Sequence, residues 1–123
     1  MQVLIDSSVL IAGPQYKIDV LKQLKVLIEG EKEFITLSTV KRELERLSEK
    51  DSVRGLNARI ALKTLSFLKV VEVEEGSVDD SIVEYAEKNK CIVCTDDREL
   101  KRRLKKAGVK TVIIKGRKKL DFA

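Results

Sequence analysis

Short apolar segments alternate with amphipathic segments along the whole chain, and this alternation limits the possible folds more than any other feature. Apolar runs of strand length predict strands over residues 3–5, 34–37, 69–73, 91–95 and 111–114. Helical spacing of apolar residues predicts helices over 18–28, 53–67 and 98–107, with two more running from Ser38 or Thr39 to 49 and from Ser77 or Asp79 to 89. Alternating strands and helices are typical of βαβ units. We therefore expect an α/β fold, a three-layer α/β/α arrangement with a central, mostly parallel, Rossmann-like sheet of five strands.

A length of 123 residues fits one domain, which we place over residues 1–123. Residues 115–123 are expected to form a basic C-terminal tail, and the single proline, Pro14, is expected in the loop before the first helix. Hydrophobic residues make up 43% of the chain, which is enough for a core. Charged residues reach 37%, against about 25% in an average domain, so the outer surfaces must be densely charged.

The chain contains no histidine. This absence excludes Ser-His-Asp triads, Cys-His pairs, histidine-ligated zinc and every nuclease that uses an imidazole as acid or base. Chemistry near neutral pH would have to come from carboxylates, lysines, hydroxyls or a metal ion. The formal net charge of +5 favours a polyanion such as nucleic acid as the partner.

Four acidic residues are expected at one edge of the sheet, where ligands bind in open α/β folds. Asp6 directly follows the first strand, and Asp97 follows the fourth strand. Glu43 lies early in the helix after the second strand, and Asp79 opens the helix after the third. The carboxyl ends of parallel strands meet at the same edge, so we expect these four side chains to share one site.

Helical phase separates these residues from their acidic neighbours. Asp79 lies on the buried stripe of its helix, whereas Asp80 lies about 110° away at 100° per residue. Asp97 similarly lies nearer to the buried stripe than Asp96. Glu43 falls on the buried flank of its helix. Asp80 and Asp96 are therefore the less favoured ligands.

Carboxylates that face a core are uncommon unless they are paired or bound to metal. Two unit charges about 5 Å apart at an effective dielectric near 20 repel by roughly 3 kcal/mol, so four together would be costly. Hard oxygen ligands select magnesium or manganese. Each acid also has a purely structural explanation: Asp6 as a strand end, Asp79 as a helix cap, Asp97 as a turn former and Glu43 as a surface charge.

The motifs that carry these acids resemble those of the PIN-domain family of metal-dependent nucleases, over nearly the full chain. They are Asp6-Ser7-Ser8 after an apolar strand, the segment 39–44 around Glu43, the segment 79–82 and the segment 95–100. The later motifs and the basic C-terminus are similar to those of archaeal members, VapC-type toxins and the nucleases of the small-subunit processome. The doubled acids at 79–80 and 96–97 leave the choice of ligand within each pair open.

The resemblance implies a magnesium- or manganese-dependent endoribonuclease with Asp6, Glu43, Asp79 and Asp97 as metal ligands. It further implies that Ser8 and Thr95 orient those ligands from behind, although both hydroxyls could equally cap backbone amides. RNA is the implied substrate, and an antitoxin, a pre-ribosomal particle or a second copy of the chain are the implied partners. The uneven placement of basic residues favours phosphate contacts from Lys101, Arg102, Arg103, Lys115, Arg117, Lys118 and Lys119, unless these simply form a solvated surface.

Other functions fit the sequence less well. A receiver domain needs an acidic pair after the first strand, and a haloacid-dehalogenase-like phosphatase needs Asp-x-Asp there, but the chain has Asp6-Ser7-Ser8. The serious alternative is a non-catalytic PIN domain that binds RNA as a ribosome-assembly factor. The absence of a signal peptide or long apolar run favours a cytoplasmic protein without a membrane segment. Cys91 and Cys94, three residues apart in a strand, are expected as buried free thiols, which suits a reducing interior.

Overall fold

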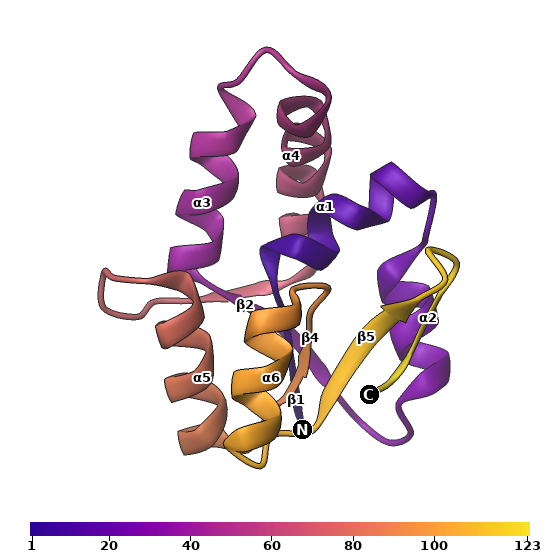
Figure 1. Cartoon of the computed structure of the whole chain (residues 1–123), viewed down its shortest axis with the longest axis vertical. Coiled ribbons are helices and arrows are strands. Elements are labelled where there is room, and N and C mark those ends of the chain that lie inside the picture. Colours follow the sequence, from indigo (N-terminus) through magenta and orange to yellow (C-terminus); the bar gives the residue numbers. More distant parts are fainter.

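A computed structural model describes all 123 residues as one sheet flanked by helices (Figure 1). The elements are β1 (Gln2–Ile5), α1 (Ser7–Tyr16), α2 (Val20–Leu27), β2 (Glu33–Leu37), α3 (Ser38–Ser48), α4 (Val53–Thr64), a short 3-10 helix (Leu65–Phe67), β3 (Lys69–Val71), α5 (Val78–Asn89), β4 (Ile92–Cys94), α6 (Arg98–Lys106), β5 (Thr111–Lys115) and β6 (Lys119–Phe122). The strand order is β3-β2-β1-β4-β5-β6. All neighbours pair in parallel except β5 and β6, which are antiparallel.

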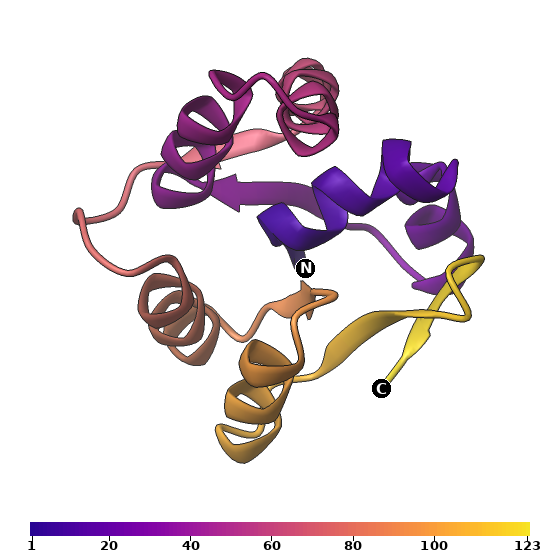
Figure 2. The same ribbon diagram turned by 45° about the horizontal axis from the view of Figure 1, so that its top comes forward.

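The helices cover both faces of the sheet, as expected for right-handed crossovers. The chain moves outward from β1 to β3 and then returns to β4, so the helices before and after that return lie on opposite faces. Figure 2 shows α1 to α4 on one side of the sheet and α5 and α6 together on the other. The predicted three-layer, mostly parallel architecture is therefore confirmed. None of the helices is long and apolar enough to cross a membrane.

The sheet has six strands rather than the five predicted. Residues 119–122, which were expected in a basic tail, form β6 and pair with β5 in register from Lys115↔Lys119 to Val112↔Phe122. The alternation of Leu120 and Phe122 with charged residues is the signature of a half-buried strand, and Leu120 is buried in the core. The high lysine content of the segment conceals this pattern.

The helix α1 was also missed, and Pro14 lies inside it rather than in a loop. Residues 9–13 are all buried, so α1 has no polar face that would produce a helical pattern. Pro14 lies past the first turn of the helix, where it removes the hydrogen bond to the Leu10 carbonyl and its ring crowds that carbonyl. This helix matters for function because its first turn carries Ser7 and Ser8.

Twenty-eight buried residues form one continuous hydrophobic cluster around the central strands. Its middle consists of aliphatic side chains from β1, β2 and β4, such as Leu4, Ile35 and Val93, which are fully buried. Cys91 and Cys94 are free and buried, as predicted. The buried sheet thus gives a rigid base for the residues that follow its strands.

Candidate metal centre

The candidate site lies where β1 and β4 end side by side. These two strands are neighbours in the sheet, although they are far apart in the sequence, and the direction of chain progression reverses between them. Such a switch point opens a crevice beyond the carboxyl ends of the strands. Asp6 follows β1, and the Thr95-Asp96-Asp97 segment follows β4. The sequence prediction that these residues share one edge is therefore correct.

Asp6 is the centre of a hydrogen-bond network at this edge. Its side chain is only 3% exposed, and it caps no backbone amide although Asp6 stands at the N-cap position of α1. Its Oδ2 instead accepts hydrogen bonds from Ser8 Oγ (2.5 Å) and Thr95 Oγ1 (2.9 Å). The structural role of a strand end or helix cap therefore does not explain why this carboxylate is buried.

Ser8 and Thr95 connect Asp6 to the loop between β4 and α6. Each hydroxyl donates a hydrogen bond to Asp6 and also accepts one from a backbone N–H. The N–H of Asp96 donates to Ser8 Oγ (2.9 Å), and the N–H of Asp97 donates to Thr95 Oγ1 (3.1 Å). Both roles considered from the sequence, orienting a carboxylate and binding a backbone amide, are thus filled by the same two side chains. The two hydroxyls fix the position of the loop relative to α1.

Glu43 approaches the site from α3 and is half-buried, as its helical phase predicts. Its carboxylate accepts a hydrogen bond from Ser7 Oγ. Ser7 is itself buried and also lies 3.5 Å from Asp6 Oδ1, so it bridges the two acids. Sequence reasoning missed this role of Ser7, for which the only signal was its place beside Asp6 and Ser8.

Asp79 and Asp80 differ as helical phase predicts. Ser77 caps α5, which frees Asp79 from the capping role considered for it, and Asp79 is half-buried. Asp80 is exposed and pairs with Arg103 of α6 at 2.7 Å. Burial raises the pKa of Asp79, the negative charges of Asp97 and Glu43 raise it further, and Arg103 opposes them.

Asp97 lies at the site but is exposed, which corrects the expectation that it faces the core. It is the N-cap of α6, and its Oδ1 accepts the N–H of Leu100 at 2.9 Å. A capping residue stands outside the helical turn, so extrapolating the helical phase back to it is unreliable. Asp96 is also exposed, and burial of its carboxylate raises its pKa while Arg117 opposes the shift.

The electrostatics of the site are those of several neighbouring carboxylates that have no ion-pair partner. Burial raises the pKa of Asp6, the Ser8 and Thr95 hydroxyls oppose this, and the charges of Asp79 and Glu43 add to it. None of Asp6, Glu43, Asp79 and Asp97 forms an ion pair with a basic residue. No three acidic side chains stand close enough together to form a preformed ligand cluster. The donor set of carboxylate oxygens nevertheless fits a hard divalent cation, which would supply the missing positive charge.

The predicted RNA-contact residues fall into two groups. Ion pairs hold Arg102 to Glu99 (2.5 Å), Arg103 to Asp80, and Lys115 to Asp121 (3.5 Å). The other four form no ion pair within the chain; they are Lys101, Arg117, Lys118 and Lys119. Three of these four lie in or beside the turn between β5 and β6, so most of the unpaired charge of this predicted set lies there.

The comparisons with known proteins agree with this architecture. The sequence profile of the family described as "PIN like domain" matches residues 3–117. The chain belongs to the PIN-like domain family. The ribonuclease VapC9 of Archaeoglobus fulgidus is 40% identical to it over 119 residues, which cover 94% of this chain and 84% of the relative. The ribonuclease VapC4 of Methanocaldococcus jannaschii is 28% identical over 95% of this chain and 92% of the relative.

Solved structures place the chain in the same fold. The PIN domain endonuclease Utp24 matches with a TM-score of 0.83 and 26% identity, over 98% of this chain and 90% of that one. A domain of a functionally unknown protein from Methanocaldococcus jannaschii matches with a TM-score of 0.69 and 20% identity, over 94% and 91% of the two chains. This second likeness shows the fold alone. The resemblance to PIN domains drawn from the sequence motifs is therefore confirmed.

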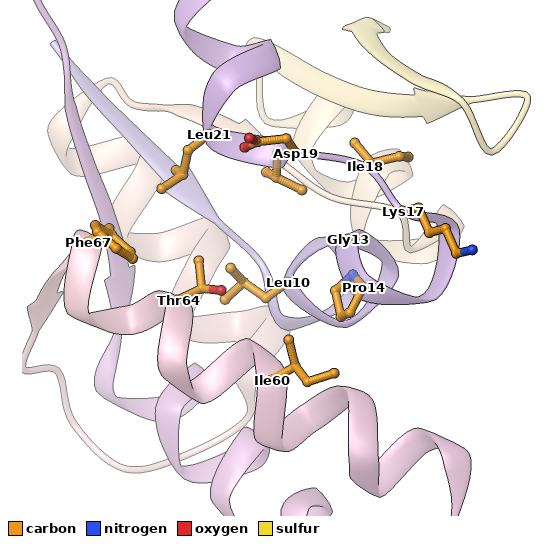
Figure 3. A pocket seen from close by; sticks show the side chains of 11 residues that line it. Leu10, Gly13, Pro14, Lys17, Ile18, Asp19, Leu21, Ile60, Thr64 and Phe67 are labelled. Carbon is orange, nitrogen blue, oxygen red and sulfur yellow. The ribbon is translucent and has the colours of Figure 1, made fainter.

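A separate cavity of about 630 Å³ lies between α1, α2 and α4 of this PIN-like domain (Figure 3). Its walls include Leu10, Pro14, Leu21, Ile60 and Phe67, so it is mostly apolar. None of the four acids lines it. Nearby on α4, Val53, Leu56 and Ile60 are exposed. This face therefore differs in chemistry from the acidic site.

Proposed function

We propose that this chain is an endoribonuclease that hydrolyses RNA phosphodiester bonds with magnesium or manganese held by its acidic residues. The observation that carries the proposal is the buried carboxylate of Asp6. It accepts hydrogen bonds from the hydroxyls of Ser8 and Thr95, lies near other carboxylates and forms no ion pair with a basic residue. Burying an ionised carboxylate without a cation beside it costs a domain stability. The ribonuclease relatives support RNA as the substrate.

Asp6, Glu43, Asp79 and Asp97 would hold the metal, with Asp80 and Asp96 as less favoured ligands. When bound, a divalent ion lowers the pKa of a water molecule and stabilises the negative charge that develops on the phosphate. Ser8 and Thr95 orient Asp6 through their hydrogen bonds, and Ser7 orients Glu43. Basic residues near the C-terminus hold the RNA backbone beside the acids.

Cleavage of labelled RNA tests this proposal directly. We would compare wild type with Asp6→Asn in magnesium, in manganese and in a chelator. We expect wild type to cleave RNA only when metal is present. The variant should cleave at least about 100-fold more slowly, because it loses one metal ligand while the residues around that ligand stay in place. RNA binding without cleavage under all three conditions would instead favour the non-catalytic assembly factor.

Metal binding has a readout that does not depend on finding the right RNA. A ligand that binds only the folded state stabilises it by about 2.7 kcal/mol at 100 times its Kd. Manganese should therefore raise the Tm of wild type by several degrees and raise that of Asp6→Asn much less. Equal shifts in both proteins would mean that the ion binds elsewhere.

The biological role within this activity is either that of a VapC-type toxin or that of an rRNA-processing nuclease. The two relatives named VapC favour the toxin, and we propose an antitoxin as the protein partner. The apolar cavity and the exposed Val53, Leu56 and Ile60 of α4 offer a surface for it. Co-purification with the product of a neighbouring gene, lost in Leu56→Asp, would support this partner. If the protein is a dimer that Leu56→Asp dissociates, the surface binds a second copy of the chain. If it binds neither an antitoxin nor a second copy, a pre-ribosomal particle becomes the favoured partner.

A further inference from the structure

The turn between β5 and β6 places a basic residue in an unfavourable backbone conformation. Gly116 has φ of 59° and Arg117 has φ of 55°, and the Lys118 N–H donates to the Lys115 carbonyl at 3.2 Å. Both central residues of this tight turn therefore have left-handed φ, a conformation that favours Gly or Asn. Glycine fills the first of them, but arginine fills the second, where its Cβ is strained. Lys17 and Lys90 have a similar φ where α1 and α5 end, so the case for Arg117 rests on what its side chain contacts.

The side chain of Arg117 is held against the end of α1. Its guanidinium carbon lies 5.5 Å from the ring centroid of Tyr16, the last residue of that helix. Figure 1 shows the yellow hairpin reaching the chain segment that joins α1 to α2, and Figure 2 shows the same neighbourhood from another side. A planar guanidinium on an aromatic ring is fixed in orientation while its N–H groups remain free to donate.

The same side chain lies at the rim of the acidic site. β5 runs parallel to β4, so its carboxyl end, and the turn that follows, emerge at the edge that carries Asp6 and Asp96. Arg117 is exposed and forms no ion pair, unlike Arg102 and Arg103. Its donors are therefore available to a ligand that reaches the site.

We propose that Arg117, oriented by the ring of Tyr16, binds a phosphate of the RNA strand next to the phosphate that is cleaved. This inference rests on the proposed ribonuclease function and assigns one specific contact within it. Arginine suits the contact because its fork of donors matches two phosphate oxygens, whereas lysine offers a point charge. Lys118 and Lys119 lack the aromatic platform, so we expect them to contribute only general attraction.

Substitution of Arg117 should separate binding from stability. We would measure the binding of a fluorescent pool of random single-stranded 20-mer RNA to each variant in a chelator, and its cleavage with manganese. Arg117→Gln should weaken binding about tenfold and raise KM similarly, with kcat within about twofold. Arg117→Lys should recover only part of the loss. Arg117→Gly should raise Tm by a few degrees, since glycine relieves the strain at positive φ, yet bind as weakly as Arg117→Gln.

Two controls make the outcome decisive. Arg54→Gln removes an exposed, unpaired arginine from α4 and should bind RNA within about twofold of wild type, which corrects for the change in net charge. Tyr16→Phe should match wild type, whereas Tyr16→Leu should reproduce part of the Arg117→Gln defect because the platform is lost.

The possible failures are distinguishable. If Arg117→Gln binds RNA as wild type does, or if Arg117→Gly unfolds at a lower temperature with unchanged binding, Arg117 only anchors the hairpin and the inference is overturned. If wild type neither binds nor cleaves the pool, the ribonuclease proposal fails, and the assignment of Arg117 fails with it.

Discussion

At the scale of single residues, the buried carboxylate of Asp6 makes a specific contribution to the pH dependence of stability. Burial raises its folded-state pKa above the ordinary value of 3.8. The folded protein therefore holds a proton that the unfolded chain has already lost, and stability falls as pH rises from 3.8 through the raised pKa. Below that window the contribution of Asp6 is fully favourable.

We therefore expect Asp6→Asn to gain stability relative to wild type as pH rises. The measurement is urea unfolding of both proteins in a chelator from pH 3.5 to 8, taking the difference between them so that carboxyl groups distant from the site cancel. The variant lacks the ionisation that disfavours folding, so its advantage should grow across the window and then level off. A difference that stays constant over this range would show that Asp6 titrates as it does in the unfolded chain.

The neighbouring acids Asp79 and Asp80 provide a second prediction at this scale. Asp79→Asn should reduce cleavage on the order of 100-fold, as expected for a ligand of the metal. Asp80→Asn should reduce it only a few-fold, because Asp80 is exposed and its pair with Arg103 stabilises the fold by about 0–1 kcal/mol. Initial cleavage rates at saturating manganese would rank them. The reverse order would assign the metal to Asp80.

The site residues could be predicted to different extents. Helical phase correctly distinguished half-buried Asp79 from exposed Asp80, since both lie inside α5. It failed at Asp97, which stands at an N-cap and is exposed. The contact of Ser7 with Glu43 joins residues 36 positions apart, and no local pattern encodes a distance of that kind.

At the scale of elements, the β4–α6 loop depends on the hydroxyl of Thr95. Thr95→Val keeps the shape of the side chain but removes a hydrogen bond to Asp6 and leaves the Asp97 N–H without its partner. We expect a loss of about 1–3 kcal/mol in the free energy of unfolding. We also expect slower cleavage, because Asp6 and the loop lose their common support. Thr95→Ser restores the hydroxyl and should recover most of both, whereas a serine variant as defective as valine would implicate the methyl group.

The C-terminal hairpin provides a second test at this scale. If residues 119–122 formed a tail, truncating Leu120 would cost little. In the structure Leu120 is 5% exposed, so Leu120→Ala should destabilise the fold by about 2–4 kcal/mol. Lys119→Ala, on the exposed face of the same strand, should change stability by less than about 0.5 kcal/mol. Urea unfolding of the two variants distinguishes a strand from a tail.

Both elements missed from the sequence were missed for the same reason. Secondary-structure prediction from a pattern needs a contrast between buried and exposed positions. In α1 the residues from Val9 to Gly13 are all buried, so the contrast disappears. In β6 the contrast covers only four residues amid lysines. The five strands that were predicted begin or end in clear polar boundaries, and their parallel order follows from the helices between them.

At the scale of the whole molecule, two charge distributions act on RNA in opposite directions. The net charge of +5 attracts the polyanion, and the unpaired lysines and Arg117 strengthen this at the β5–β6 turn. The acidic site, which stands at the same edge of the sheet, repels a phosphate that approaches it. The protein therefore attracts RNA from a distance. The acidic site repels the RNA phosphate at close range until cations screen its carboxylates.

This conflict predicts that removing acids tightens RNA binding while abolishing cleavage. Each lost carboxylate at the site removes a repulsion of about 0.5–1 kcal/mol in a largely hydrated setting, which corresponds to a two- to fivefold lower Kd. In a chelator at fixed ionic strength, the double variant Asp6→Asn/Asp79→Asn should therefore bind labelled single-stranded RNA about four- to 25-fold more tightly than wild type. Magnesium should strengthen binding by wild type and leave the double variant nearly unchanged. If the double variant binds no more tightly than wild type, the RNA does not pass over the acidic site, and its contacts must lie on another face of the domain.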